Sequence, residues 1–121
     1  MAMKTLVILN HPLTAEQTTE LGGTIVNLTP AQKALWANIP AIGDAQAVRD
    51  HLAEIIMEIQ QVNQVVCQGE STAFAQIVRI CDAWDIPVLV ACSMRESVET
   101  VQSDGSTVKT NVFRHVQFRR V

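Results

Sequence analysis

The chain has 121 residues and a formal net charge of −3, with 48% apolar and 17% charged residues. This length allows a single domain, residues 1–121, with one modest core, and the composition excludes intrinsic disorder. The weakly acidic balance disfavours a long nucleic acid as the main partner.

Apolar runs and helix-start signals divide the chain into alternating strands and helices. Short runs rich in β-branched residues predict buried strands, whereas side-chain caps and helical spacing of apolar residues predict helices. In chain order we expect a strand over 4–10, a helix capped by Thr14, a strand over 24–28, a helix from Thr29 to about Trp36, a helix over 48–62, a strand over 64–68, a helix capped by Ser71 or Thr72, and a strand over 88–92. This alternation predicts an α/β domain with a mostly parallel sheet.

The pattern changes after residue 92. Segments 97–103 and 106–118 have the character of two strands, and Asp104-Gly105 between them suits a two-residue hairpin turn. Strict alternation along the second strand places His115 and Phe118 on opposite faces. We therefore expect a single α/β domain that ends in a β-hairpin.

Positive charge is concentrated at the end of the chain. Residues 1–90 carry four basic and nine acidic side chains, whereas residues 91–121 carry five basic and three acidic ones. A local excess of arginine on an acidic protein indicates a compact anionic ligand. A charged edge strand that resists aggregation is the other interpretation, and charge alone slightly favours it.

Neither a membrane segment nor a metal site is indicated. The apolar segment 6–9 is too short to span a bilayer, and its flanks do not resemble a secretory signal. Cys67, Cys81 and Cys92 lack the spacing of metal ligands or of a disulfide framework. We expect a cytoplasmic protein with reduced thiols, no bound metal or other cofactor, and no contact with a membrane.

Ligands of open α/β sheets bind outside the carboxyl ends of the parallel strands. Three groups of polar residues follow predicted strands: Asn10-His11, Gln68-Gly69-Glu70-Ser71-Thr72 and Ser93-Met94-Arg95. His11 can exchange a proton near neutral pH, and Arg95 can bind phosphate through two hydrogen bonds. Gly69 before a helix suits a phosphate seat, although a tight turn explains a single glycine equally well.

Five short motifs follow one another between residues 4 and 120. They are Leu9-Asn10-His11-Pro12-Leu13-Thr14-x-x-Gln17, Leu35-Trp36-x-Asn38-Ile39-Pro40, Gln68-Gly69-Glu70, Ser93-x-Arg95 and Phe113-x-His115-Val116-x-Phe118-Arg119. Together they resemble the small CRISPR-associated proteins of the Csx-twenty family, which accompany type III CRISPR systems. The chain departs from that pattern at Ser71-Thr72, where an aromatic residue or a glycine is expected.

The resemblance implies a single Rossmann-like, CARF-like domain that works as a homodimeric ring nuclease, linearising cyclic tetra-adenylate without a metal and so ending antiviral signalling. It implies catalytic roles for His11, Arg95 and His115. The ligand-binding residues that it implies are Asn10, Gln68, Gly69, Glu70, Ser71, Thr72, Ser93 and Arg119. Two other functions stay open: a sensor or sponge that binds the same messenger without cutting it, and a Rossmann-like interaction protein with no nucleotide ligand.

Overall fold

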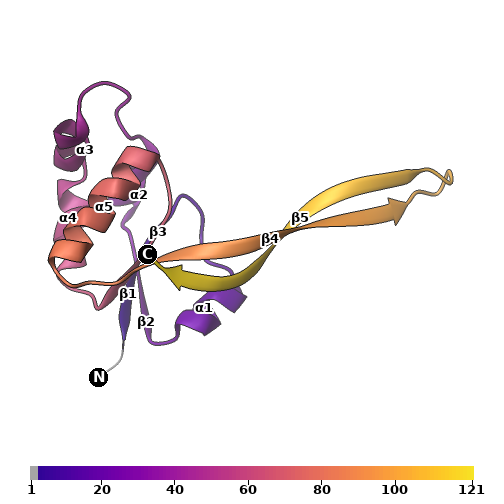
Figure 1. Cartoon of the computed structure of the whole chain (residues 1–121), viewed down its shortest axis with the longest axis horizontal. Coiled ribbons are helices and arrows are strands. Elements are labelled where there is room, and N and C mark those ends of the chain that lie inside the picture. Colours follow the sequence, from indigo (N-terminus) through magenta and orange to yellow (C-terminus); the bar gives the residue numbers. More distant parts are fainter. Residues whose placement is uncertain (1–2) are drawn as a thin grey trace.

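Two regions of different shape make up the molecule, a layered α/β body and a long two-stranded arm that projects from it (Figure 1). The computed structural model describes residues 3–121. The elements are β1 (Lys4–Ile8), α1 (Ala15–Leu21), β2 (Thr24–Asn27), α2 (Pro30–Ala37), α3 (Ala45–His51), α4 (Ala53–Ile59), β3 (Gln64–Cys67), α5 (Ser71–Ala83), β4 (Val88–Val101) and β5 (Thr107–Arg120).

One five-stranded sheet organises the body, in the order β2-β1-β3-β4-β5. The first four strands pair in parallel and β5 pairs antiparallel with β4. The prediction of an α/β fold with a mostly parallel sheet and a C-terminal hairpin is therefore confirmed. From β1 the chain first passes to β2 on one side of the sheet and then crosses back to β3 on the other side. In sheets of this order, ligands bind near the place where the direction reverses, between β1 and β3.

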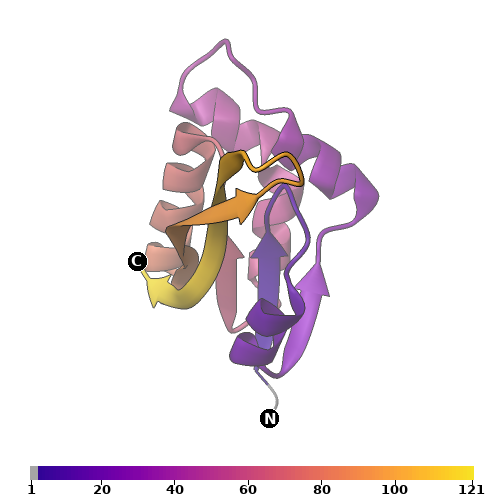
Figure 2. The ribbon, with the colours of Figure 1, turned by 90° about the vertical axis from the view of Figure 1, so that its right-hand side faces the viewer.

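The two faces of the sheet are covered unequally, as the end-on view shows (Figure 2). Helices α2 to α5 pack on one face around side chains such as Ile8, Ile55 and Ile77, all fully buried. On the other face α1 covers a smaller cluster built on Val7, Leu9 and Val66. Successive strand residues point to opposite faces, so the continuous apolar run of β1 supplies both clusters.

Two local predictions about helices are wrong. The expected helix over 48–62 is divided at Leu52, where a turn separates α3 from α4. Helix α5 is capped by Glu70, not by Ser71 or Thr72, because the Glu70 carboxylate accepts hydrogen bonds from the backbone N–H groups of Thr72 and Ala73. The expected helix starts at Thr14 and Thr29 are confirmed, and each threonine forms a capping box, Thr14 with Gln17 and Thr29 with Gln32.

The terminal hairpin is longer than the sequence indicates, because β4 does not stop at Cys92. It pairs with β3 only at Val88 and Leu89, then continues beside β5 to Val101. A five-residue loop, 102–106, joins the strands in place of the expected two-residue turn. We call residues 94–114 the arm, and in the described structure each of its strands pairs only with the other.

A β-bulge marks the base of the arm. Cys92 lies opposite Gln117 and Ser93 lies opposite His115, so Val116 is the extra residue on β5. This insertion breaks the strict alternation, and it brings the rings of His115 and Phe118 to 5.0 Å between centroids. The prediction that these two residues occupy opposite faces is therefore wrong.

Candidate functional site

A pocket of about 430 Å³ opens beyond the carboxyl ends of β1 and β2. Its walls are Val7, Leu9, Asn10, His11, Pro12, Asn27, Lys33 and Ala37. Parallel strands end at the same edge of a sheet, so the turn after β1, the end of β2 and the first turns of α2 meet there. The pocket combines an apolar floor from β1 with an imidazole, an ammonium group and two amides.

His11 is exposed at this pocket, and one hydrogen bond indicates which of its ring nitrogens carries the proton. Its Nδ1 lies 3.2 Å from the carbonyl oxygen of Pro12. A carbonyl only accepts, so in the neutral ring Nδ1 carries the proton and Nε2 keeps a free lone pair. The ring is thereby prepared to accept a proton at Nε2 from a bound hydroxyl group.

Sequence reasoning missed Lys33 and Asn27, although a signal for both was present. Asn27 is the last residue of β2 and lies opposite Val7 of β1. Lys33 lies early in α2, and only two residues separate the end of β2 from the start of this helix. A helix that follows a parallel strand so closely starts at the ligand-binding edge, so its first polar residues are candidates.

The turn after β3 is organised by structural contacts. Gly69 lies against Trp36, and a Cβ atom at this position would come within 2.6 Å of the indole ring. The indole Nε1 donates to the carbonyl oxygen of Gln68 at 3.1 Å, and the Gln68 side chain donates to Ala91 of β4 at 3.4 Å. Close packing of Trp36 therefore accounts for the glycine without a bound phosphate.

A carboxylate already occupies the amino end of α5. The two oxygens of Glu70 accept from Thr72 N at 3.0 Å and from Ala73 N at 2.9 Å, and these bonds lower the pKa of Glu70. Ser71 lies in the same first turn, exposed to solvent. An anionic ligand at this helix end would meet a negative charge, so Glu70 opposes the predicted phosphate seat.

His115 is held away from this pocket by α1. Its side chain is 5% exposed, its Nε2 lies 3.2 Å from Glu20 Oε1, and Gln17 Nε2 lies 3.4 Å from its Nδ1. The second oxygen of Glu20 accepts from the backbone N–H of Phe118 at 2.7 Å. Both ring nitrogens of His115 are therefore engaged in fastening β5 to the body.

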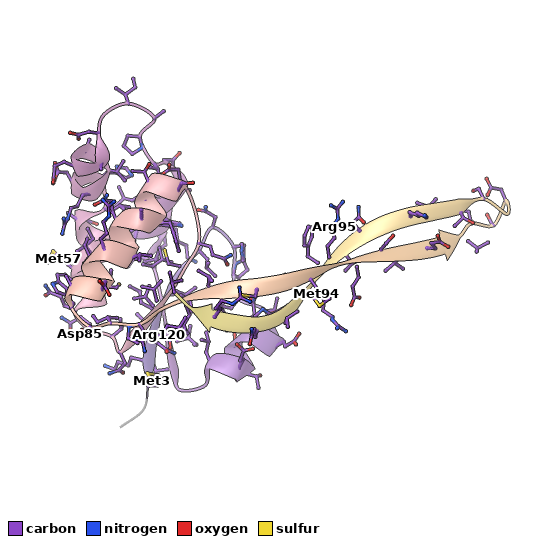
Figure 3. All side chains as sticks on the ribbon, viewed as in Figure 1. Met3, Met57, Asp85, Met94, Arg95 and Arg120 are labelled. Carbon is purple, nitrogen blue, oxygen red and sulfur yellow. The ribbon has the colours of Figure 1, made fainter. Side chains whose placement is uncertain are left out.

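Arg95 and its neighbours lie on the hairpin. None of the residues that line the pocket comes from beyond residue 37. Arg95 projects from the arm at a distance from the body (Figure 3). Ser93 is exposed opposite His115, and Arg119 is exposed opposite Val90. Of the three implied catalytic residues, one copy of the chain brings only His11 to the pocket.

Residues 3–119 match the uncharacterized protein MJ1673 family. The chain belongs to this family. No curated protein and no solved structure matched the chain in the corresponding searches. The MJ1673 match spans nearly the whole body and the arm, so both regions are features of the family's sequence pattern.

Within the described part of the structure, the thiols and carboxylates of this MJ1673-family chain do not form a metal centre. Among residues 3–121, no group of three or more His, Cys, Asp or Glu side chains is placed to hold a metal ion. Burial raises the pKa of Cys67, and it raises that of Cys81 to about 11, so both are unreactive thiols at neutral pH. In the same described range, no helix has the length and apolar character that crossing a membrane requires.

Proposed function

We propose that this protein is a CARF-like ring nuclease that binds cyclic tetra-adenylate and linearises it in the cytoplasm, as part of type III CRISPR antiviral signalling. The observation that carries the proposal is the pocket at the carboxyl ends of β1 and β2, which gathers Asn10, His11 and Lys33. These groups suit a nucleotide, because an ammonium group pairs with phosphate and amides bond to ribose or to a base edge.

The proposed reaction needs no metal ion. The ribose 2′-oxygen attacks the adjacent phosphorus, the bond from phosphorus to the 5′-oxygen breaks, and a 2′,3′-cyclic phosphate and a 5′-hydroxyl result. His11 Nε2 accepts the proton from the 2′-hydroxyl, and the departing 5′-oxygen takes a proton from solvent. Lys33 stabilises the charge that develops on the phosphate, so positioning and electrostatics supply the rate enhancement.

The size of the pocket supports two copies acting together. A volume of about 430 Å³ lies toward the lower end of the range for small-molecule sites, about 300–1,000 Å³. A ring of four adenylates exceeds what one such pocket encloses. Two pockets related by a twofold axis would each hold half of a ring that has the same symmetry, and we therefore propose a homodimer.

One observation favours a second candidate, a sensor or sponge that binds the messenger without cutting it. His115 has both ring nitrogens occupied by Gln17 and Glu20, and it does not line the pocket. A pocket served by a single histidine has fewer groups for proton transfer than a nuclease normally uses.

The test is to incubate the purified protein with cyclic tetra-adenylate in excess EDTA and to separate the products by liquid chromatography with mass detection. Linear products that end in a 2′,3′-cyclic phosphate support the nuclease. An intact ring that nevertheless binds saturably, measured by calorimetry, supports the sensor. Absence of both cleavage and binding contradicts both functions.

Matched variants connect the result to the pocket. His11→Ala should abolish cleavage while binding persists, and Lys33→Ala should weaken binding about tenfold or more, as expected for the loss of one charge-assisted contact. Lys4→Ala is the control, since Lys4 is an exposed lysine at the start of β1, on the opposite edge of the sheet. An equal effect of Lys33→Ala and Lys4→Ala would exclude the pocket as the binding site.

A further inference from the structure

The arm is built without support from the rest of its own chain. The large apolar side chains that it exposes are Met94, Val98, Val101, Val108, Val112 and Phe113, each at least 44% accessible. An isolated two-stranded ribbon is marginally stable in water, and such ribbons become stable when another surface covers one face. The arm therefore has the properties of a segment that is covered in the functional state.

The two faces of the arm differ in character. Residues directly opposite one another share a face, so Met94, Val98, Val108 and Val112 lie together on one side, interrupted by the Glu96–Arg114 ion pair at 3.4 Å. The other side is mainly polar, with the Lys109–Glu99 pair at 3.6 Å in its middle. The apolar side supplies contact area and the polar side presents functional groups.

One pair on the polar side has the composition of a nucleotide-binding site. Arg95 lies directly opposite Phe113, whose side chain is 72% exposed. Within residues 3–121, Arg95 forms no ion pair and no side-chain hydrogen bond. A free guanidinium binds phosphate through two hydrogen bonds, and an exposed aromatic ring stacks on a base.

This pair does not line the pocket of its own chain, whose walls come from residues 7–37. The end of β3 at Cys67 is level with Val90 of β4, and Arg95 is five residues further along the strand, about 16 Å at roughly 3.3 Å per residue. Figure 3 shows Arg95 on the projecting arm, to one side of the ribbon and well separated from the helices of the body. Any pocket that Arg95 completes must belong to another molecule.

The charge and the length of the arm favour a second copy of this chain as that molecule. The arm carries three basic and three acidic residues, so it lacks the positive charge that a nucleic acid or an anionic membrane would require. Its 21 residues, 94–114, reach the roughly 20–30 residues that one side of a stable interface contributes when both faces and the tip of the arm are covered. Residues 1–90 of the second copy carry nine acidic and four basic side chains, and this net negative charge attracts the unpaired Arg95 at long range. The pocket itself is lined by His11 and Lys33 and by no carboxylate, so the partner of Arg95 there is the phosphate of a bound ligand.

We propose that the arm of each copy packs on the other copy, and that Arg95 and Phe113 complete the other copy's pocket beside Asn10, His11 and Lys33. Arg95 binds the phosphate under attack and Phe113 stacks on an adenine. This inference rests on the proposed function and deepens it, because it assigns two groups of the nucleotide site to the partner chain. It also explains why an implied catalytic arginine lies on a projecting hairpin.

Complementation between two inactive variants tests the proposal. Arg95→Ala and His11→Ala should each abolish cleavage of cyclic tetra-adenylate alone. When they are mixed after subunit exchange, half of the dimers pair one chain of each kind, and each such dimer has one complete site. The mixture should therefore recover about one quarter of the wild-type activity. If each pocket used its own Arg95, every site in the mixture would be defective.

The outcomes separate this inference from the function on which it rests. A wild type that cuts the ring, beside a mixture no more active than its parents, overturns the inference and leaves the nuclease intact. A wild type that neither binds nor cuts the ring overturns the function and the roles of Arg95 and Phe113 with it. Affinity tags of two kinds on the variants verify that mixed dimers have formed.

Two further variants provide controls. Phe113→Ala should weaken ring binding about tenfold, whereas Phe113→Trp should retain it, since stacking requires only an aromatic face. Arg79→Ala removes an exposed arginine from α5, outside the pocket and the arm, and should leave activity unchanged. Equal binding by Phe113→Ala and the wild type would overturn the stacking role.

Discussion

The body and the arm share one strand, and β4 shows how differently they are stabilised. At its start, Val88 is 3% exposed and packs against the helices of the body, whereas Val98 and Val101 further along are 44% and 72% exposed. The backbone pairing is continuous across this change. Hydrogen bonding thus defines the strand over its whole length, while burial stabilises only its first part. The comparison predicts that the body is stable by itself and that the arm gains stability only when another surface covers it.

The largest expected effect comes from truncating the core of the body. Ile55→Ala should lower the free energy of unfolding by about 2–5 kcal/mol, because Ile55 is fully buried among α4, α5 and the sheet. Val98→Ala on the arm should cost less than about 0.5 kcal/mol in dilute solution. Urea denaturation followed by circular dichroism measures both. Similar losses for the two variants would contradict an independently stable body.

The connection between the two regions should give the next largest effect. Glu20→Ala removes the acceptor for Phe118 N and the partner of His115, and should cost about 1–2 kcal/mol. Because the base of the arm is released, amide exchange along β5 should also become faster. Glu16→Ala, an exposed glutamate in the first turn of the same helix, is the control. Unchanged exchange in Glu20→Ala would show that the hairpin alone holds β5 in place.

Replacing a threonine in each region compares the stability of the body and of the arm for the same change of side chain. Thr29 caps α2 and accepts from Gln32 N at 3.2 Å, so Thr29→Ala should cost about 1 kcal/mol. Thr29→Ser should recover most of this loss, since the hydroxyl group remains. Thr110→Ala on the exposed arm should change stability by less than about 0.5 kcal/mol. Thermal melts monitored by circular dichroism check the series, and a larger loss for Thr110→Ala would reverse the comparison.

The smallest expected effect is the loss of the stability contribution of Glu70 at low pH. Hydrogen bonds from Thr72 and Ala73 lower the pKa of Glu70 from 4.5 in the folded chain, so its carboxylate stabilises α5 above that pH. This contribution is lost as the pH falls through the lowered value. The stability difference between wild type and Glu70→Gln should therefore be present at pH 7 and shrink below pH 4.5. Urea midpoints measured from pH 7 to pH 3 test this.

An acidic residue at the tip of the arm provides the comparison for the pH dependence at Glu70. Asp104 also has a lowered pKa, because its carboxylate accepts from the hydroxyl and the N–H of Ser106 at the tip of the arm. Asp104→Asn should leave the urea midpoint of the body unchanged at every pH. A shift equal to that of Glu70→Gln would mean that the arm and the body unfold as one unit.

Sequence reasoning could predict the body because local and tertiary signals agree there. The buried run of β1 and the capping boxes at Thr14 and Thr29 each indicate an element that the fold then uses. The division at Leu52 was not predictable, since Val48, Ile55 and Ile59 continue one helical stripe across it and remain buried. The cap by Glu70 was obscured because Ser71 and Thr72 have higher cap preference.

The arm and the candidate site were harder for a physical reason. Apolar alternation marks strands that have one buried face, and residues 93–97 have none, so the continuation of β4 leaves no such pattern. Asn10 and His11 were predictable because they follow an obvious strand. The location of Arg95 was not, since it depends on how far β4 extends beyond the sheet.

The bulge at Val116 has a consequence for how this shape can vary. The bulge changes which residues of β5 face each side of the sheet. Before it, Val112 points outward from the arm, and after it, Phe118 points into the body. Removing Val116 while Glu20 still holds Phe118 would shift every arm residue of β5 by one position, so inward and outward side chains would exchange. One inserted residue therefore allows the outer segment to be redesigned, in evolution or in the laboratory, without disturbing how the inner segment is anchored.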